Sequence, residues 1–156
     1  MEISPEHQQC RDLDWFCLDA DGHVGHFTTA GHKYLPRSVA ASSENLETLT
    51  AFFLGLRADG GHEVDAHLAE AVPELSQLGE RYLRDFVGMA ERGLFSFDIE
   101  SYLKPGIAYF RVALSLRPLK AEHLPEPIRE IISQFVLKGR LLKSTSRIPY
   151  EETLEI

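Results

Sequence analysis

The chain of 156 residues is 44% hydrophobic and carries a formal net charge of −8, from 24 acidic and 16 basic side chains. This length and apolar content predict one globular domain, residues 1–156, rather than a disordered chain. The acidic balance argues against nucleic-acid binding, which needs a basic face for the phosphates. No stretch approaches the ~20 apolar residues of a membrane span. The charge suits a basic partner, although acidity also serves solubility alone.

Both ends of the chain are polar. We expect residues 1–10 and the tail 143–156 to be poorly ordered. The sequence shows no signal-peptide pattern, and its only cysteines are Cys10 and Cys17. A cytoplasmic protein with reduced thiols is therefore expected.

Residues 12–28 predict a β-hairpin. Side-chain character alternates over 13–18 and again over 23–28, as it does in strands. The sequence Asp-Ala-Asp-Gly at 19–22 is typical of a tight turn, because aspartate can bond the backbone two residues on and glycine tolerates positive φ. The loop 29–36 follows and mixes polar and aromatic groups, as surface loops that carry contacts often do.

A first amphipathic helix is predicted after this loop. Apolar residues from Leu46 to Leu56 have the spacing of one helix face, which predicts packing against a core. Ser42 or Ser43 suits the N-cap position, because a serine oxygen can accept from the free N–H groups of the first turn.

A second helix is predicted over residues 75–92, where apolar side chains recur with helical spacing. Gly93 is a natural stop for it. Between the two helices, residues 62–78 predict a loop with helical turns, because Pro73 limits any helix through them.

The C-terminal half predicts a second group of strands. Residues 94–101 and 108–116 alternate in character and are separated by a Lys-Pro-Gly turn signal at 104–106. A short helix is expected at 126–133 and a last strand at 135–142. The predicted class is α+β, with a mostly antiparallel sheet built from the N-terminal hairpin and the C-terminal strand group and packed with two main helices.

Histidines near the hairpin invite a test for metal binding. His23, His26 and His32 lie close in sequence to Asp19 and Asp21, and histidine with carboxylate suits a transition metal. On a strand, however, His23 and His26 point to opposite faces because their separation is odd. The spacing therefore favours a turn with exposed histidines.

A second group of histidines lies in the segment 59–74. The metalloprotease pattern H-E-x-x-H begins at His62-Glu63, but Ala66 stands where its second histidine belongs, and His67 comes one residue too late. We predict a solvated polar segment there. The sequence therefore predicts no metal and no cofactor.

Catalytic motifs are also absent from the sequence. Cys17 lies within a predicted strand, which favours a buried thiol over a nucleophile. No serine stands in a G-x-S-x-G context, and no glycine pattern of a phosphate-binding loop occurs. We predict a non-enzymatic protein with no catalytic residue. The alternative is a small metal-dependent or hydrolytic enzyme that uses the histidine-rich loops, and a stand-alone domain without a specific ligand is a third reading.

The hairpin and the later strands carry a likeness to known bacterial domains. The pattern W-F-x-x-D-x-x-G-x-x-x-x-F-x-[TS]-x-G is matched by Trp15, Phe16, Asp19, Gly22, Phe27, Thr29 and Gly31. The later half matches at Gly93, Asp98, Tyr109, Arg117-Pro118-Leu119 and Leu124-Pro125. Over residues 12–135 the chain resembles domains that occur among the immunity proteins of polymorphic toxin systems. This resemblance implies a cytosolic protein that binds and neutralises a toxin domain, and it carries over no binding residue.

A partner-binding surface is predicted on the second hairpin strand and the loop after it. This loop is too polar for a core and yet holds an aromatic residue, as interface anchors often are. The candidate partner-binding residues are Asp19, Asp21, His23, His32, Lys33 and Tyr34. The competing surface is the acidic segment 59–74, and a basic toxin domain is the expected partner for either. The sequence makes no prediction of oligomeric state.

One packing contact is predicted as well. Trp15 shares a strand face with Leu13 and Cys17, so it is expected to be buried. The apolar stripe of the first helix, which carries Phe52 and Phe53, is its expected partner.

Overall fold

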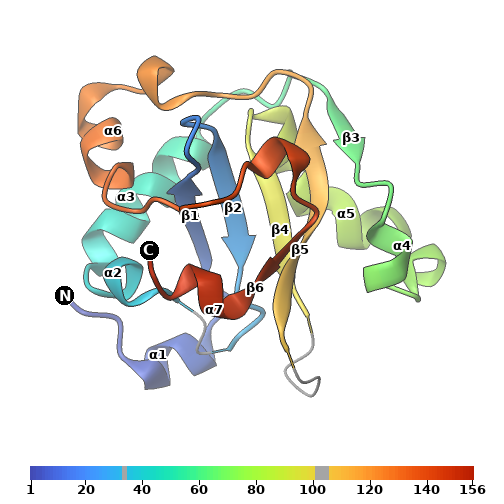
Figure 1. Cartoon of the computed structure of the whole chain (residues 1–156), viewed down its shortest axis with the longest axis horizontal. Helices are drawn as coiled ribbons and strands as arrows, with labels where there is room; N and C mark the ends of the chain where they lie inside the picture. The colour runs from blue at the N-terminus through green and yellow to red at the C-terminus, as the bar shows by residue number, and fades with distance from the viewer. Residues whose placement is uncertain (33–34, 101–105) are drawn as a thin grey trace.

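The fold combines a sheet with several helices. The computed structural model describes residues 1–32, 35–100 and 106–156 (Figure 1). In chain order the elements are α1 (Pro5–Cys10), β1 (Asp14–Leu18), β2 (Val24–Thr28), α2 (Arg37–Ala40), α3 (Ser43–Leu54), β3 (His62–Val64), α4 (Leu68–Ala71), α5 (Leu75–Glu91), β4 (Phe95–Ile99), β5 (Ala108–Ser115), the 3-10 turn η1 (Ala121–His123), α6 (Glu126–Ile132), the 3-10 turn η2 (Leu142–Ser144), β6 (Arg147–Pro149) and α7 (Tyr150–Thr153). The α+β class is confirmed.

The strands form one curled sheet of six strands among the described residues. Their order is β1-β2-β4-β5-β3, and β6 pairs with β5 as well. All pairs are antiparallel except β2 and β4, which run parallel. The mostly antiparallel prediction therefore fits, but the sheet is mixed, because the chain between β2 and β4 returns through α3 and α5.

β5 supports two strands along the same edge. Its residues 113–115 pair with β3, and its residues 108–110 pair with β6. The segment 62–64, predicted as loop, is thus a short strand. The predicted strand 135–142 is wrong, since this segment makes only a single parallel bridge from Val136 to Leu18.

The hairpin forms where its turn chemistry predicts. The Asp19 carboxylate oxygen Oδ1 accepts hydrogen bonds from the backbone N–H groups of Asp21 and His23, each at 2.9 Å. Gly22 has φ of 78°, a value that glycine adopts without strain. The side chain of one aspartate therefore fixes the turn between β1 and β2.

Both predicted helices are present, with one departure. α3 begins after Ser42, whose hydroxyl oxygen accepts from the backbone N–H of Asn45 at 3.2 Å. α5 is broken at Gly79, which has φ of 58° and ψ of −148°. Gly93, with φ of 103°, follows its C-terminus as predicted.

Trp15 and Phe16 lie on opposite faces of the sheet. Trp15 is fully buried, stacks on Phe27 at 4.3 Å between ring centroids and donates its indole N–H to the Tyr109 hydroxyl at 3.2 Å. Phe16, not Trp15, packs against α3, with its ring 4.8 Å from that of Phe53. The burial of Trp15 is confirmed and its predicted partner is wrong. We call the face of Trp15, Phe27, Phe97 and Tyr109 the aromatic face, and the opposite one the helical face.

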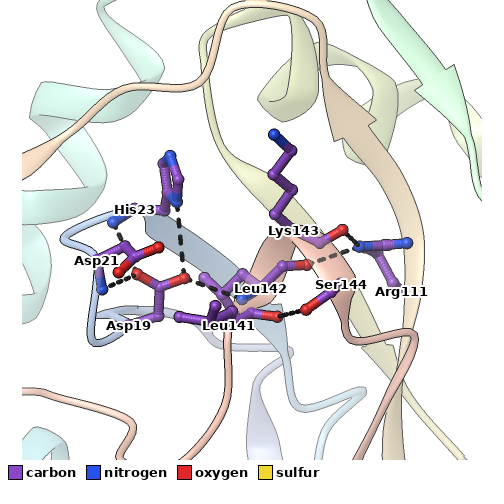
Figure 2. A network of polar contacts seen from close by, with 8 residues as sticks. All are labelled: Asp19, Asp21, His23, Arg111, Leu141, Leu142, Lys143 and Ser144. Atoms are coloured by element: carbon purple, nitrogen blue, oxygen red, sulfur yellow. Dashed lines mark hydrogen bonds and ion pairs between the residues drawn. The ribbon is translucent and has the colours of Figure 1, made fainter.

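A C-terminal strap, residues 135–146, passes over the aromatic face (Figures 1 and 2). The Leu142 N–H donates to Asp19 Oδ2 at 2.9 Å. The Arg111 guanidinium donates to the carbonyl oxygens of Leu142 and Lys143, at 2.6 and 2.9 Å. Its Nε donates to the buried Asp65 at 2.7 Å. Two buried acids and one arginine thus fasten the strap to the sheet.

The chain ends carry more structure than expected. Residues 1–10 include α1, whose N-cap Ser4 accepts from the His7 N–H. Residues 143–156 include β6 and α7, and the side chains of Ile148 and Thr153 are buried. Among the described residues, the helices are all too short or too polar to cross a bilayer.

Candidate functional site: an acidic groove

The structure separates the predicted partner-binding residues. Asp19 is only 3% exposed, so its carboxylate lies inside the fold and not on the surface. Asp21 is exposed, and His23 and His32 are half-buried. Lys33 and Tyr34 lie outside the described residues. The outward side of the turn therefore presents Asp21 with part of His23, and binding there stays a prediction.

The histidines near the hairpin do not converge. His23 packs edge-on against Phe95, with the ring centroids 5.6 Å apart, whereas His26 lies on the helical face near Phe16. In the part of the chain that the structure describes, no group of three or more histidine, cysteine or carboxylate side chains is placed to hold a metal ion. The odd spacing places the two histidines on opposite faces of the sheet, as predicted. The prediction that they are exposed is wrong, because His26 is buried in the sheet and His23 is half-buried.

The competing segment also divides between surface and interior. Asp65 is buried and binds Arg111, so it helps to hold the strap on the sheet and does not face a partner. His62 lies 3.2 Å from the carboxylate of Glu91, and His67 lies 3.6 Å from that of the exposed Glu70. Only part of the predicted acidity of this segment faces solvent.

A different feature stands out on the helical face. Two hollows of about 720 and 670 Å³ adjoin there and share Asp12, Asp14 and Asp85. The larger lies between α3 and α5 over β1, β2 and β4, and the smaller lies between α1 and α3 beside the start of β1. We call the two together the acidic groove.

Carboxylates outnumber arginines along the acidic groove. Three arginines line it, Arg11, Arg84 and Arg92. The guanidinium of Arg92 is occupied by the backbone carbonyl oxygens of Leu56 and Gly88. Six carboxylates line it, none paired with lysine or arginine among the described residues: Glu2, Asp12, Asp14, Glu47, Asp85 and Asp98. The groove is therefore a local source of negative potential.

A buried histidine forms the floor of the larger hollow. His26 is 1% exposed, and its Nδ1 lies 2.7 Å from the hydroxyl oxygen of Ser96, which is fully buried. Its Nε2 lies 3.1 Å from Oδ2 of Asp14, whose side chain is 36% exposed. Asp14, His26 and Ser96 thus form a line from the groove into the sheet.

Asp14, His26 and Ser96 are the residue types of a hydrolytic triad, but their order from solvent to interior is reversed. In a hydrolase the serine hydroxyl must meet the substrate, with histidine and carboxylate behind it. Here Ser96 is at the buried end and Asp14 is at the open end. Ser96 cannot act as a nucleophile in this arrangement. The line instead holds the Asp14 carboxylate in the groove.

A second carboxylate, that of Asp98, is built into the wall of the larger hollow. Its Oδ1 accepts from the Thr28 hydroxyl at 2.7 Å, and its Oδ2 accepts from the Tyr82 hydroxyl at 2.7 Å. Burial and the nearby negative charge of Asp98 raise the pKa of Tyr82 above its usual value. Tyr82 is therefore a neutral hydrogen-bond donor at physiological pH.

Asp12 shows the electrostatic strain of the groove. Its pKa is raised, first by partial desolvation and then by the charge of Asp14, against a lowering by the Ala30 N–H. A cation beside Asp12 would offset the repulsion from the neighbouring negative charges. The groove therefore favours positively charged ligands.

Cys17 is no candidate for catalysis. It is fully buried on the aromatic face, and burial raises the pKa of its thiol. Cys10 is exposed, and neither cysteine forms a disulfide.

Comparisons of the chain with protein-family models, with curated proteins and with solved structures each gave no match. The resemblance to immunity proteins therefore stays a prediction.

The sequence contained only a faint signal of this groove. Asp12 and Asp14 alternate with Leu13 and Trp15, so both acids lie on the strand face opposite the indole. The same alternation is typical of an ordinary core strand, and it assigns no role to the two acids. Asp85 lies in α5, far along the chain from Asp12 and Asp14, and periodicity alone does not place it beside them.

Proposed function

We propose that this protein is a non-enzymatic binding module that receives a basic surface of another protein in its acidic groove. The observation that carries the proposal is the cluster of carboxylates around Asp12, Asp14 and Asp85, none of which forms an ion pair with a lysine or arginine of the described chain. Such a field speeds the approach of a basic partner, and oppositely charged groups set the partner's orientation.

Neutralisation of a toxin is the form of binding that we favour. It requires a complementary surface and no catalytic residue. This agrees with the burial of Ser96, which a substrate does not reach, and with the burial of Cys17. Many toxin domains that act on nucleic acids have basic active-site surfaces, because their substrate is a polyanion. A rigid acidic groove is suited to cover such a surface in the cytoplasm.

An acid–base enzyme is the second candidate. The contact of His26 with Asp14 and the raised pKa of Asp12 are features that also occur in active sites. The low exposure of His26 weighs against this candidate, because a catalytic base must reach the proton that it abstracts.

The test is affinity capture from the native host, followed by mass spectrometry. The bait is the full chain, either unchanged or with the groove neutralised by Asp12→Asn, Asp14→Asn and Asp85→Asn. A matched control removes three exposed acids outside the groove and outside both surfaces predicted from the sequence, through Glu130→Gln, Glu151→Gln and Glu155→Gln. We expect a basic partner that the groove variant loses and the control retains.

The captured partner then decides the function. Its association rate should fall in the groove variant at low salt, and the difference should shrink at high salt because the charges are screened. Co-expression should suppress the toxicity of the partner only when the groove is intact. Equal capture by all three baits would sink the proposal. Turnover of a small molecule that Asp14→Asn abolishes would favour the enzyme instead.

A further inference from the structure

The floor of the acidic groove leaves one polar atom without a hydrogen bond. Nε2 of His26 is buried and makes none in the described structure. It lies 3.1 Å from Asp14 Oδ2, close enough for charge attraction, but the contact lacks the angles of a hydrogen bond. Buried polar atoms in this state are rare and call for an explanation.

The position of Asp14 supplies that explanation. Its carboxylate is 36% exposed, so one part contacts the buried ring and another faces the groove. Ser96 fixes the ring from behind at 2.7 Å. A bound cation would reorient the Asp14 carboxylate. One of its oxygens would then accept a hydrogen bond from Nε2 of His26 while the carboxylate also contacts the cation.

The lining of the larger hollow indicates which cation fits. Asp12 and Asp14 both line this hollow, so a ligand with several N–H groups that enters it can reach both carboxylates. Phe86 and Tyr82 line the same hollow and offer ring surface. A guanidinium donates through a planar fork and stacks on aromatic rings, whereas an ammonium is a compact, strongly hydrated point charge.

We propose that the larger hollow is a binding site for one arginine side chain of the partner protein, held between Asp12 and Asp14, with His26 as the positioning residue of Asp14. This inference rests on the proposed function, since it names the group of the basic partner that the groove recognises. The charge-assisted hydrogen bonds between the guanidinium and these carboxylates would be stronger than hydrogen bonds between neutral groups.

The probe is a blocked tripeptide, acetyl-Gly-Arg-Gly-amide, added to the isotope-labelled full chain and followed by NMR. Two matched peptides carry lysine, which keeps the charge, or citrulline, which keeps the shape and loses the charge. We expect the arginine peptide to shift the side-chain nitrogen signals of His26. The lysine peptide should bind several-fold more weakly, at least ~3-fold because it cannot form the fork. Citrulline should not bind.

Variants then locate the site. Asp14→Asn should weaken arginine binding about tenfold, the cost of one charge-assisted bond. Asp12→Asn, at an exposed position that is safer for folding, should also weaken it. Glu130→Gln makes the same change from acid to amide at an exposed position outside the groove and should leave binding unchanged.

Each outcome decides the inference. Equal affinity for arginine and lysine, equal loss in Glu130→Gln, or a His26 signal that does not shift on saturation would overturn it. If a basic partner is captured through the groove while the arginine peptide fails, the proposed function stands and the arginine site falls. If the peptide binds as expected but no basic partner needs the groove, the arginine site stands and the proposed function falls.

Discussion

At the scale of single residues, the hairpin shows what alternation can and cannot predict. Trp15 and Phe16 are adjacent, and alternation correctly places them on opposite faces. Both are fully buried, because other parts of the chain pack on each face of the sheet. Alternation does not reveal which element packs on which face. The sequence pattern therefore pairs Trp15 with α3, although its ring stacks on Phe27.

Trp15→Ala is expected to destabilise the protein by about 3–5 kcal/mol, because it removes a large buried ring and leaves a cavity. Trp15→Phe keeps most of the packing and loses the hydrogen bond to Tyr109, so it should cost less, about 1–3 kcal/mol, which includes leaving the buried hydroxyl without this donor. Urea unfolding of both variants measures these values. An Ala variant as stable as the parent would contradict the core position of the indole.

Asp12 predicts a pH dependence of unexpected sign. Its pKa in the folded state lies above the ordinary value of 3.8, so the folded chain binds this proton more tightly than the unfolded chain does. Its contribution to stability therefore falls as pH rises from 3.8 through the folded-state pKa. Asp12→Asn should be more stable than the parent above that window and equal to it below.

The measurement is thermal unfolding of parent and Asp12→Asn across the acid range, with Asp21→Asn as the control for loss of one negative charge. Solvent screening keeps the effect small at this exposed position, and low ionic strength enlarges it. A variant that is less stable than the parent at neutral pH would show that Asp12 is not under electrostatic strain.

At the scale of elements, the strap shows where local pattern fails. Its apolar residues predict a strand at 135–142, yet only Val136 bridges β1. Leu137 and Leu142 are instead buried as single anchors, and the chain turns at Gly139 with φ of 77°. Apolar content predicted burial correctly, but hydrogen-bond partners depend on which sheet edge is free.

Gly25→Ala is expected to loosen the strap. An added Cβ would lie 2.7 Å from the Phe27 ring and 2.9 Å from Leu142 Cδ1, and the stacked rings cannot yield easily. The overpacking should cost about 1–3 kcal/mol. Gly88→Ala in α5 is the control. Its new Cβ would lie 3.1 Å from Nη1 of Arg92, at the end of a long side chain, so a small shift of this guanidinium and of its hydrogen bond to the Gly88 carbonyl accommodates it.

Only the alanine at position 25 should destabilise the protein. Gly88→Ala should be neutral or stabilise the protein by up to ~1 kcal/mol through helix propensity. Chemical denaturation gives both values, and hydrogen exchange at the Leu142 amide reports the strap directly. Unchanged exchange at this amide in Gly25→Ala would mean that the strap does not rest on Gly25.

At the scale of the whole molecule, sequence reasoning predicted the class, the hairpin and both main helices, because these depend on local pattern and turn chemistry. It did not predict the acidic groove. Asp14 and Asp85 belong to different elements and meet only when α5 packs on the sheet. The same holds for Arg111, whose partners Asp65 and Leu142 come from distant parts of the chain.

The shared edge of β5 has a consequence for how the chain folds during its synthesis. β3 leaves the ribosome before β5, but β6 and Leu142 leave after it. Until β6 and Leu142 have left the ribosome, part of the β5 edge has no strand partner and the aromatic face lacks the strap. A nascent chain that has reached β5 therefore displays an apolar surface and an open strand edge, features that chaperones bind and that lead to aggregation.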